Sequence, residues 1–190
     1  AALNLVRLFM NRLILFRFDI EKEVVEGQNV GSGAAEFGMY IATGLLIAGS
    51  VAGEGGGPDT AAAFFGMGLV LLVAFALFYQ LTTSFDVHSE IEGKNTAVGI
   101  ALGGNLIAIG LVTFKAVFGD FDGWNEGVAA FITFGVIGFA LLYVMRLLLD
   151  KLLLPTVSAS KAIAVDRNLG VAFIESAVVI SSALILFIAI

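Results

Sequence analysis

Apolar residues are concentrated in five long segments of the chain, separated by shorter polar stretches. The segments cover residues 30–52, 61–83, 96–118, 127–149 and 169–190. Each is long enough to cross a bilayer, because about 20 residues of α-helix span the hydrocarbon core. Two intervening stretches, 53–59 and 119–124, contain several Gly and acidic residues, which is typical of tight reversals between antiparallel helices. The pattern predicts an all-α, polytopic helical membrane protein with five transmembrane helices.

The N-terminal stretch, residues 3–18, is apolar but interrupted by three arginines. Asn4, Arg7 and Asn11 share one face of a helix, a pattern typical of an amphipathic helix that lies in the membrane interface. The stretch is equally compatible with the end of a sixth span. We therefore expect an amphipathic or partial membrane helix at residues 1–18, with its depth in the membrane left open.

The ten Lys and Arg residues are distributed unevenly between the two sides that alternating spans define. Lys115 alone falls on one side, and the other nine fall on the opposite side. Cytoplasmic loops of membrane proteins carry such an excess of Lys and Arg. The pattern predicts a multi-pass protein of a prokaryotic cytoplasmic (inner) membrane. The loops around Lys22, Lys94 and Lys161 would face the cytoplasm, and the C-terminus would lie outside.

A short motif recurs along the chain. Residues 26–29 read Glu-Gly-Gln-Asn, and residues 92–95, which lie 66 positions later, read Glu-Gly-Lys-Asn. Residues 165–168, Val-Asp-Arg-Asn, form a weaker third copy, and Phe18-Asp19 recurs as Phe85-Asp86 with an offset of 67. Motifs that are two spans apart have the same orientation in the membrane, unlike the inverted repeats of many transporters. The expected organisation is an N-terminal helix at 1–18, a first repeat unit at 19–84, a second repeat unit at 85–150 and a third half-unit at 151–190.

Each copy of the motif ends in an Asn just before a predicted span, and the span begins with small residues. An Asn at this position caps a helix by accepting hydrogen bonds from its free backbone N–H groups. Small residues let neighbouring membrane helices approach closely. We interpret the motif as a capped and closely packed helix start. The alternative is a ligand-binding cytoplasmic loop, because acidic residues gather around it. The motif residues are Glu26, Gly27, Asn29, Glu92, Gly93, Asn95, Asp166 and Asn168, and the other acidic residues are Asp19, Glu21, Glu23, Asp86 and Glu90.

Two ionisable residues, Glu36 and Glu175, fall inside predicted spans, each seven positions after a motif Asn. A charged group that faces lipid is costly, so both carboxyls must face protein or a wet cavity. Asn105, in the third span, adds an amide that could hydrogen-bond a carboxyl group. One interpretation is a pair of uncharged, hydrogen-bonded glutamates that join helices; the other is a proton or cation site formed by both. The full candidate set is Glu36, Tyr40, Thr43, Asn105, Glu175 and Ser182, with Ser32 on the same face as Glu36.

The composition removes several classes of activity. Hydrophobic residues make up 59% of the chain and charged residues 14%, whereas soluble domains carry about 45–50% and about 25%. There is no Cys and one His, so we expect no metal site and no haem. A net charge of −6 argues against nucleic acid as a partner. No HExxH, P-loop or nucleophile–base pair occurs, so we expect no catalytic residues, no cofactor and no enzymatic activity.

The remaining polar and aromatic residues have expected places at the membrane surface. His88 falls in a loop that we expect to be solvated. Lys115 and Arg146 lie near span ends, where their ammonium and guanidinium groups can reach the headgroups. Trp124 and Tyr143 lie near the interfaces, where amphipathic rings are favoured.

Residues 91–104, Ile-Glu-Gly-Lys-Asn-Thr-Ala-Val-Gly-Ile-Ala-Leu-Gly-Gly, and their fainter counterparts at Asn29 and Asn168 carry a resemblance to a known family. The chain resembles DUF350, the YjfL-like family of uncharacterised prokaryotic inner-membrane proteins. The resemblance implies an all-helical membrane module made of two or three related units and associated with membrane stress. It implies no catalytic residues.

Two functions remain for this chain. The first is a non-enzymatic packing, scaffold or accessory subunit of a membrane assembly. Its partners would be the lipid bilayer, identical or different membrane subunits, and a cytoplasmic protein at the acidic loops. The second is a small proton or cation pathway that uses Glu36 and Glu175. We expect the first.

Overall fold

The structure is a computed structural model that describes residues 22–148 and 158–189. Every regular element within these residues is a helix. Five helices are long and apolar enough to cross a membrane, which confirms the predicted all-α, five-span architecture. They are α2 (Val30–Val51), α3 (Pro58–Thr82), α5 (Thr96–Val117), α6 (Trp124–Leu148) and α8 (Leu169–Ala189). The helix expected at residues 1–18, with its arginines, and residues Asp19, Glu21 and Lys151 lie outside the described residues.

Helices α3 and α6 begin earlier than their apolar segments, at Pro58 and Trp124 rather than at residues 61 and 127. Proline is compatible with the first helical turn, where its missing N–H group would have no partner within the helix. Gly57 caps α3, and its N–H donates to the hydroxyl of Thr60 at 2.8 Å. Hydropathy marks where a chain enters lipid, whereas capping groups mark where its helix begins.

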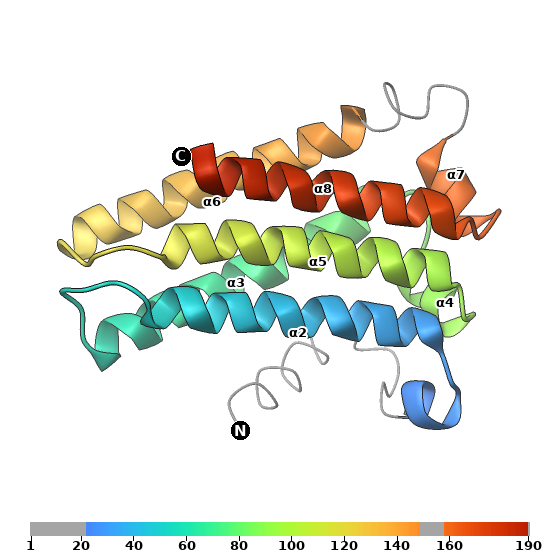
Figure 1. Cartoon of the computed structure of the whole chain (residues 1–190), viewed down its shortest axis with the longest axis horizontal. Coiled ribbons are helices and arrows are strands. Elements are labelled where there is room, and N and C mark those ends of the chain that lie inside the picture. The colour runs from blue at the N-terminus through green and yellow to red at the C-terminus, as the bar shows by residue number, and fades with distance from the viewer. Residues whose placement is uncertain (1–21, 149–157, 190) are drawn as a thin grey trace.

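The long helices form two groups of opposite direction. Helices α2, α5 and α8 lie side by side and run the same way, with α5 in the middle, whereas α3 and α6 return behind them (Figure 1). We call the end where α2, α5 and α8 begin the cap end. The opposite end, which carries the loops at residues 52–57 and 118–123, is the hairpin end. Helices α2, α5 and α8 together are the inner layer, and α3 and α6 are the outer layer.

Three short helices at the cap end were not predicted from the sequence (Figure 1). They are the π-helix η1 (Lys22–Glu26), α4 (Val87–Glu92) and α7 (Ala159–Ala164). Asp86 caps α4 by accepting bonds from the N–H groups of His88 and Ser89, and Ser158 caps α7. A helix of one or two turns has too few positions to show a hydrophobic period, so only these caps were readable in advance.

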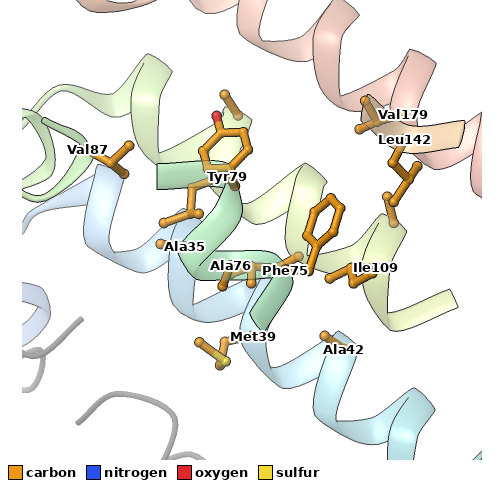
Figure 2. Packing of buried hydrophobic residues seen from close by; sticks show 14 of the residues in the cluster. Ala35, Met39, Ala42, Phe75, Ala76, Tyr79, Val87, Ile109, Leu142 and Val179 are labelled. Atoms are coloured by element: carbon orange, nitrogen blue, oxygen red, sulfur yellow. The ribbon is translucent and has the colours of Figure 1, made fainter. Parts of the chain in front are cut away.

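The core lies around α5, which is buried along nearly its whole length. Figure 2 shows Ala35, Met39 and Ala42 of α2 in one cluster with Phe75, Ala76 and Tyr79 of α3. Ile109 of α5, Leu142 of α6 and Val179 of α8 extend the same cluster. Since every other long helix packs on α5, this helix holds the bundle together.

The inner layer is packed through glycines. A methyl group added at Gly99 would overlap the backbone of Gly31, and one added at Gly38 would overlap the backbone of Gly103. On the other side of α5, a methyl group at Gly104 would overlap Ser176 of α8. Small residues at these positions let the helix backbones touch, which increases dispersion contacts between membrane helices.

The outer layer is packed through aromatic rings. Phe139 of α6 lies 5.1 Å from Phe75 and 4.5 Å from Phe78 of α3, measured between ring centroids. Towards the hairpin end, Phe64 of α3 stacks on Trp124 of α6 at 6.3 Å. Large rings therefore bridge α3 and α6, in contrast to the direct backbone contacts of the inner layer.

Candidate functional site

Each inner-layer helix starts with one of the three motif asparagines. The side-chain oxygen of Asn29 accepts a hydrogen bond from the N–H of Ser32 at 3.1 Å, which caps α2. Asn95 accepts from Val98 at 3.4 Å to cap α5. Asn168 accepts from Val171 at 3.2 Å at the start of α8. All three asparagines therefore act as helix caps.

The residue before each asparagine has an unusual backbone conformation. Gln28, Lys94 and Arg167 have φ angles of 48°, 59° and 50°, the only positive values among the non-glycine residues described. A non-glycine residue in this left-handed region is uncommon and costs free energy, so the surrounding structure must hold it there. The turn reverses the chain between each short helix and the long helix that follows. Nothing in the sequence identified these residues as left-handed, because none is Gly or Asn.

Two of the asparagines also bind the short helix that precedes the next inner-layer helix. The amide of Asn29 donates to the backbone oxygen of Ile91 at 2.8 Å. The amide of Asn95 donates to the backbone oxygens of Ile163 at 3.2 Å and Ala164 at 3.0 Å. These amides are almost completely buried, with 2% and 0% of the two residues exposed. Each bond therefore joins the start of one inner-layer helix to the loop of the next.

A carboxyl group supports each of these two amides. The amide of Asn29 donates to Glu23 at 3.0 Å, and that of Asn95 donates to Glu90 at 2.9 Å. The sequence motif instead emphasised Glu26, Glu92 and Asp166, which are exposed. The sequence feature that could have identified Glu23 and Glu90 as equivalent is their separation of 67 positions. This separation is one more than the 66 positions between Asn29 and Asn95.

The π-helix η1 explains this difference of one residue. In a π-helix the backbone bond closes over five residues, and the N–H of Gly27 donates to Lys22 at 3.0 Å in this way. The turn therefore holds one more residue between Glu23 and Asn29 than α4 holds between Glu90 and Asn95. The amide–carboxyl pair forms in both places despite the extra residue.

The intramembrane carboxyl of Glu175 joins α8 to α5. Asn105 donates to Glu175 at 3.3 Å and to the backbone oxygen of Ala101 at 2.9 Å. The hydroxyl of Ser176 donates to the backbone oxygen of Ile100 at 3.1 Å, also on α5. Glu175 and Asn105 are buried, with 6% and 4% of each residue exposed. The bond that the sequence suggested between a carboxyl and Asn105 is thus made with Glu175.

Glu36 has different surroundings. It is buried on α2, and α5 lies between α2 and α8, so the two carboxyls are on opposite sides of the central helix (Figure 1). Ser32 and Thr43 are buried on the same face of α2, whereas Tyr40 is half-buried. Ser182, on the Glu175 face of α8, donates within its own helix to Val178 at 2.7 Å. The candidate polar residues therefore form two separate groups.

Comparison with family models decides the family. The model described as "Domain of Unknown Function (DUF350)" matches residues 1–51 and 56–190. The chain belongs to the DUF350 family. No match was found among curated proteins or among solved structures.

One expectation for this DUF350 protein was wrong. His88 does not lie in a solvated loop: it lies in α4 with 4% of the residue exposed. Its Nδ1 atom is 3.9 Å from a carboxyl oxygen of Asp86, which caps the same helix. The cause is the unpredicted α4, in which His88 shares the buried side of the helix with Val87 and Ile91. Within the described ranges, no three His, Asp or Glu side chains form a group that could hold a metal ion.

A pocket of about 320 Å³ lies at the hairpin end of this DUF350 protein. The two hairpin loops are hydrogen-bonded to each other beside it. The N–H of Glu54 donates to the carboxyl group of Asp120 at 2.7 Å, and the N–H of Phe121 donates to the backbone oxygen of Glu54 at 2.8 Å. Glycines, Phe64 and Phe121 contribute to its lining, but Glu36, Asn105 and Glu175 do not. The pocket and the intramembrane carboxyls are therefore separate features.

Proposed function

We propose that this DUF350 protein is a non-enzymatic packing or scaffold subunit of an assembly in the cytoplasmic membrane of a prokaryote. The observation that supports this most is how the buried polar groups are used. Asn29 and Asn95 each bind the short helix that precedes the next inner-layer helix, and Asn105 of α5 binds Glu175 of α8. Polar groups used in this way fix the arrangement of helices in the membrane.

The proposed orientation places the cap end in the cytoplasm. Lys22, Lys94, Lys161 and Arg167 lie at the cap end, and Lys115 is in the last turn of α5 at the hairpin end. The positive-inside rule then puts the hairpin loops and the C-terminus outside. The exposed acidic residues of the cap end, Glu26, Glu92 and Asp166, would be available to a cytoplasmic partner.

Recovery of partners from the membrane tests this proposal. A tagged copy and an untagged copy of the full chain are expressed together and extracted in a mild detergent. We expect purification on the tag to recover the untagged copy, other membrane chains, or both. Recovery of the tagged chain alone under every gentle condition would contradict a role as an assembly subunit.

A second candidate, a proton or cation pathway, is favoured by one observation. Glu175 is a carboxyl group within a candidate membrane span and is hydrogen-bonded to an amide from another span, and intramembrane carboxyls often mark ion or proton routes. Vesicles containing the protein and a pH-sensitive dye would report flux under an imposed potential. We expect none. Flux that Glu175→Gln abolishes would replace the scaffold proposal with this one, whereas flux that survives Glu36→Gln and Glu175→Gln would need another route.

A further inference from the structure

The two interfaces of the inner layer use equivalent pairs of positions. Gly38 of α2 contacts Gly103 of α5, and Gly104 of α5 contacts Ser176 of α8. Gly38 of α2 corresponds to Gly104 of α5, which lies 66 positions later, and Gly103 of α5 corresponds to Ser176 of α8, which lies 73 positions later. The same two offsets separate the capping asparagines. Helix α5 therefore uses the Gly103 side for α2 and the Gly104 side for α8.

A second set of pairs follows the same rule. Gly99 contacts Gly31, and the corresponding residues of the next interface, Ala97 and Ala172, are both fully buried. Gly110 contacts Ala42, and the corresponding residues, Ala108 and Ala183, are fully buried as well. The two interfaces thus share one arrangement over most of the membrane depth.

The outer side of α8, which points away from α5, has the same kind of face as the one that α5 uses to contact α8. It is also the kind of face that α2 uses to contact α5. Its positions are Gly170, Ala177 and Ser181, which correspond to Ala97, Gly104 and Ala108 of α5. All three are exposed, as are Phe173 and Ile188 beside them, at 60% and 82%. Small residues are common where membrane helices meet, and a lipid-facing surface has no need of them.

The outer side of α2 carries the complementary face. Its positions are Gly33, Phe37 and Gly44, which correspond to Gly99, Gly103 and Gly110 of α5. A methyl group added at Gly33 or Gly44 would meet no described atom within 4 Å, and Phe37 is 63% exposed. An open hollow of about 450 Å³ lies beside Gly33 and is also lined by Val24, Gln28 and Val30. On α5, the corresponding place beside Gly99 is filled by Gly31.

The loops at the cap end also lack a matching contact at each edge of the inner layer. Asn168 is exposed, and no bond from its amide to another described residue accompanies its cap, although Asn29 and Asn95 each bind the next loop. The residue four positions before Asn29 is Val25, which is 70% exposed. Its counterparts, Ile91 and Ala164, are buried, and their backbone oxygens accept the bonds from Asn29 and Asn95.

The geometry points to a second copy of this chain that docks head to tail, with α8 of one copy against α2 of the next. This inference rests on the proposed role as an assembly subunit and names its partner and interface. The inner layer then continues from copy to copy in one direction. Gly170, Ala177 and Ser181 of the first copy meet Gly33, Phe37 and Gly44 of the next, and the amide of Asn168 reaches the backbone oxygen of Val25. Such an interface is heterologous, so it builds a ring or an open row rather than a two-fold dimer.

Phe37 is the one bulky residue among the three matched α2 positions, Gly33, Phe37 and Gly44, since Gly103 and Ser176 occupy the positions of α5 and α8 that correspond to Phe37. Its ring must lie along Ala177 of the neighbouring copy, so the two helices are farther apart at this depth than the helices of the two interfaces within a chain. Helices that are farther apart have fewer backbone contacts and separate more easily, which suits subunits that fold before they associate.

Cysteine cross-linking between differently tagged copies tests the arrangement, and the chain has no Cys of its own. One full-length copy carries Phe37→Cys and the other Ala177→Cys; both side chains are exposed, so folding should be retained. The two are expressed together and oxidised in native membranes, and the product is read on a non-reducing gel. We expect a disulfide-linked product with both tags at about tenfold or more over the control, because docking raises the effective concentration of the two thiols.

The control replaces Ala177→Cys by Ala140→Cys. Ala140 is an exposed alanine of α6, eight residues from the end of that helix at the cap end, as Ala177 is eight residues from the start of α8. Strong cross-linking of Ala177→Cys with itself would indicate a two-fold contact and overturn the head-to-tail arrangement. A mixed product no stronger than the control would also overturn it and assign these faces to lipid, to residues 1–18 or to another protein. The proposed function survives either result if tagged purification still recovers partners.

Discussion

The inner and outer layers of the bundle are held together by different means. In the inner layer, glycines bring the backbones of α2, α5 and α8 into contact, and buried amides bind across the helices. In the outer layer, rings such as Phe78, Phe139 and Tyr143 bridge α3 and α6. Lipid is as apolar as these rings, so burying them gains little from the hydrophobic effect. The geometry of the bundle is therefore determined mainly by the inner layer.

Substitution of an inner-layer glycine should have the largest effect. Gly99→Leu places a side chain where the backbone of Gly31 lies, so we expect the free energy of unfolding to fall by about 3 kcal/mol or more. Titration with a denaturing detergent, followed by circular dichroism or the fluorescence of the single Trp124, measures it. Gly66→Leu in α3 is the matched control, because its added methyl group meets no described atom within 4 Å. Equal destabilisation by both substitutions would remove the distinction between the layers.

The two kinds of capping asparagine provide the next comparison. Asn95→Ala removes a cap and also leaves buried carbonyl groups without a donor, so we expect a loss of about 2–3 kcal/mol. Asn168→Ala removes an exposed cap, which is worth about 1 kcal/mol. The same detergent titration, performed on dissociated chains, would show the difference. Similar losses for the two variants would mean that the bonds between loops contribute little.

Removal of an aromatic ring from the outer layer should lower the free energy of unfolding less than disruption of a backbone contact in the inner layer. Phe139→Leu removes ring contacts with Phe75 and Phe78 while keeping an apolar side chain, so we expect a loss of about 1 kcal/mol. Leu fits many positions in a membrane bundle, and the helices can adjust around it. A loss as large as that of Gly99→Leu would show that ring contacts also determine the geometry.

The smallest effect is expected at the intramembrane carboxyl. Glu175→Gln keeps a side chain of nearly the same shape that can still accept from Asn105, so stability should change by less than about 0.5 kcal/mol. Glu175→Leu is the informative companion, because it leaves the amide of Asn105 with only its bond to Ala101. Thermal unfolding in detergent micelles compares the three proteins. A large loss for Glu175→Gln would indicate that the carboxyl has a role beyond accepting this bond.

The sequence predicted the five spans because a run of about 20 apolar residues has one structural solution in a bilayer. The caps at Asn29, Asn95 and Asn168 were equally readable, since an Asn before an apolar run satisfies free N–H groups. The short helices were not predicted, because one or two turns are too few to show a hydrophobic period, and the burial of His88 follows from its place in α4. The partners of the asparagines, Ile91 and Ala164, could not be predicted either, since backbone oxygens carry no sequence signal.

Counting the chains in the intact protein tests the account most directly. Native mass spectrometry of the full-length protein, released from lipid nanodiscs, gives the mass of each species. The account predicts species at multiples of the 19.9 kDa chain mass, alone or together with another membrane protein. It further predicts that Ala177→Trp shifts these species to single chains, while Ala140→Trp does not. A wild-type spectrum that contains single chains alone, under conditions that preserve other membrane assemblies, would contradict it.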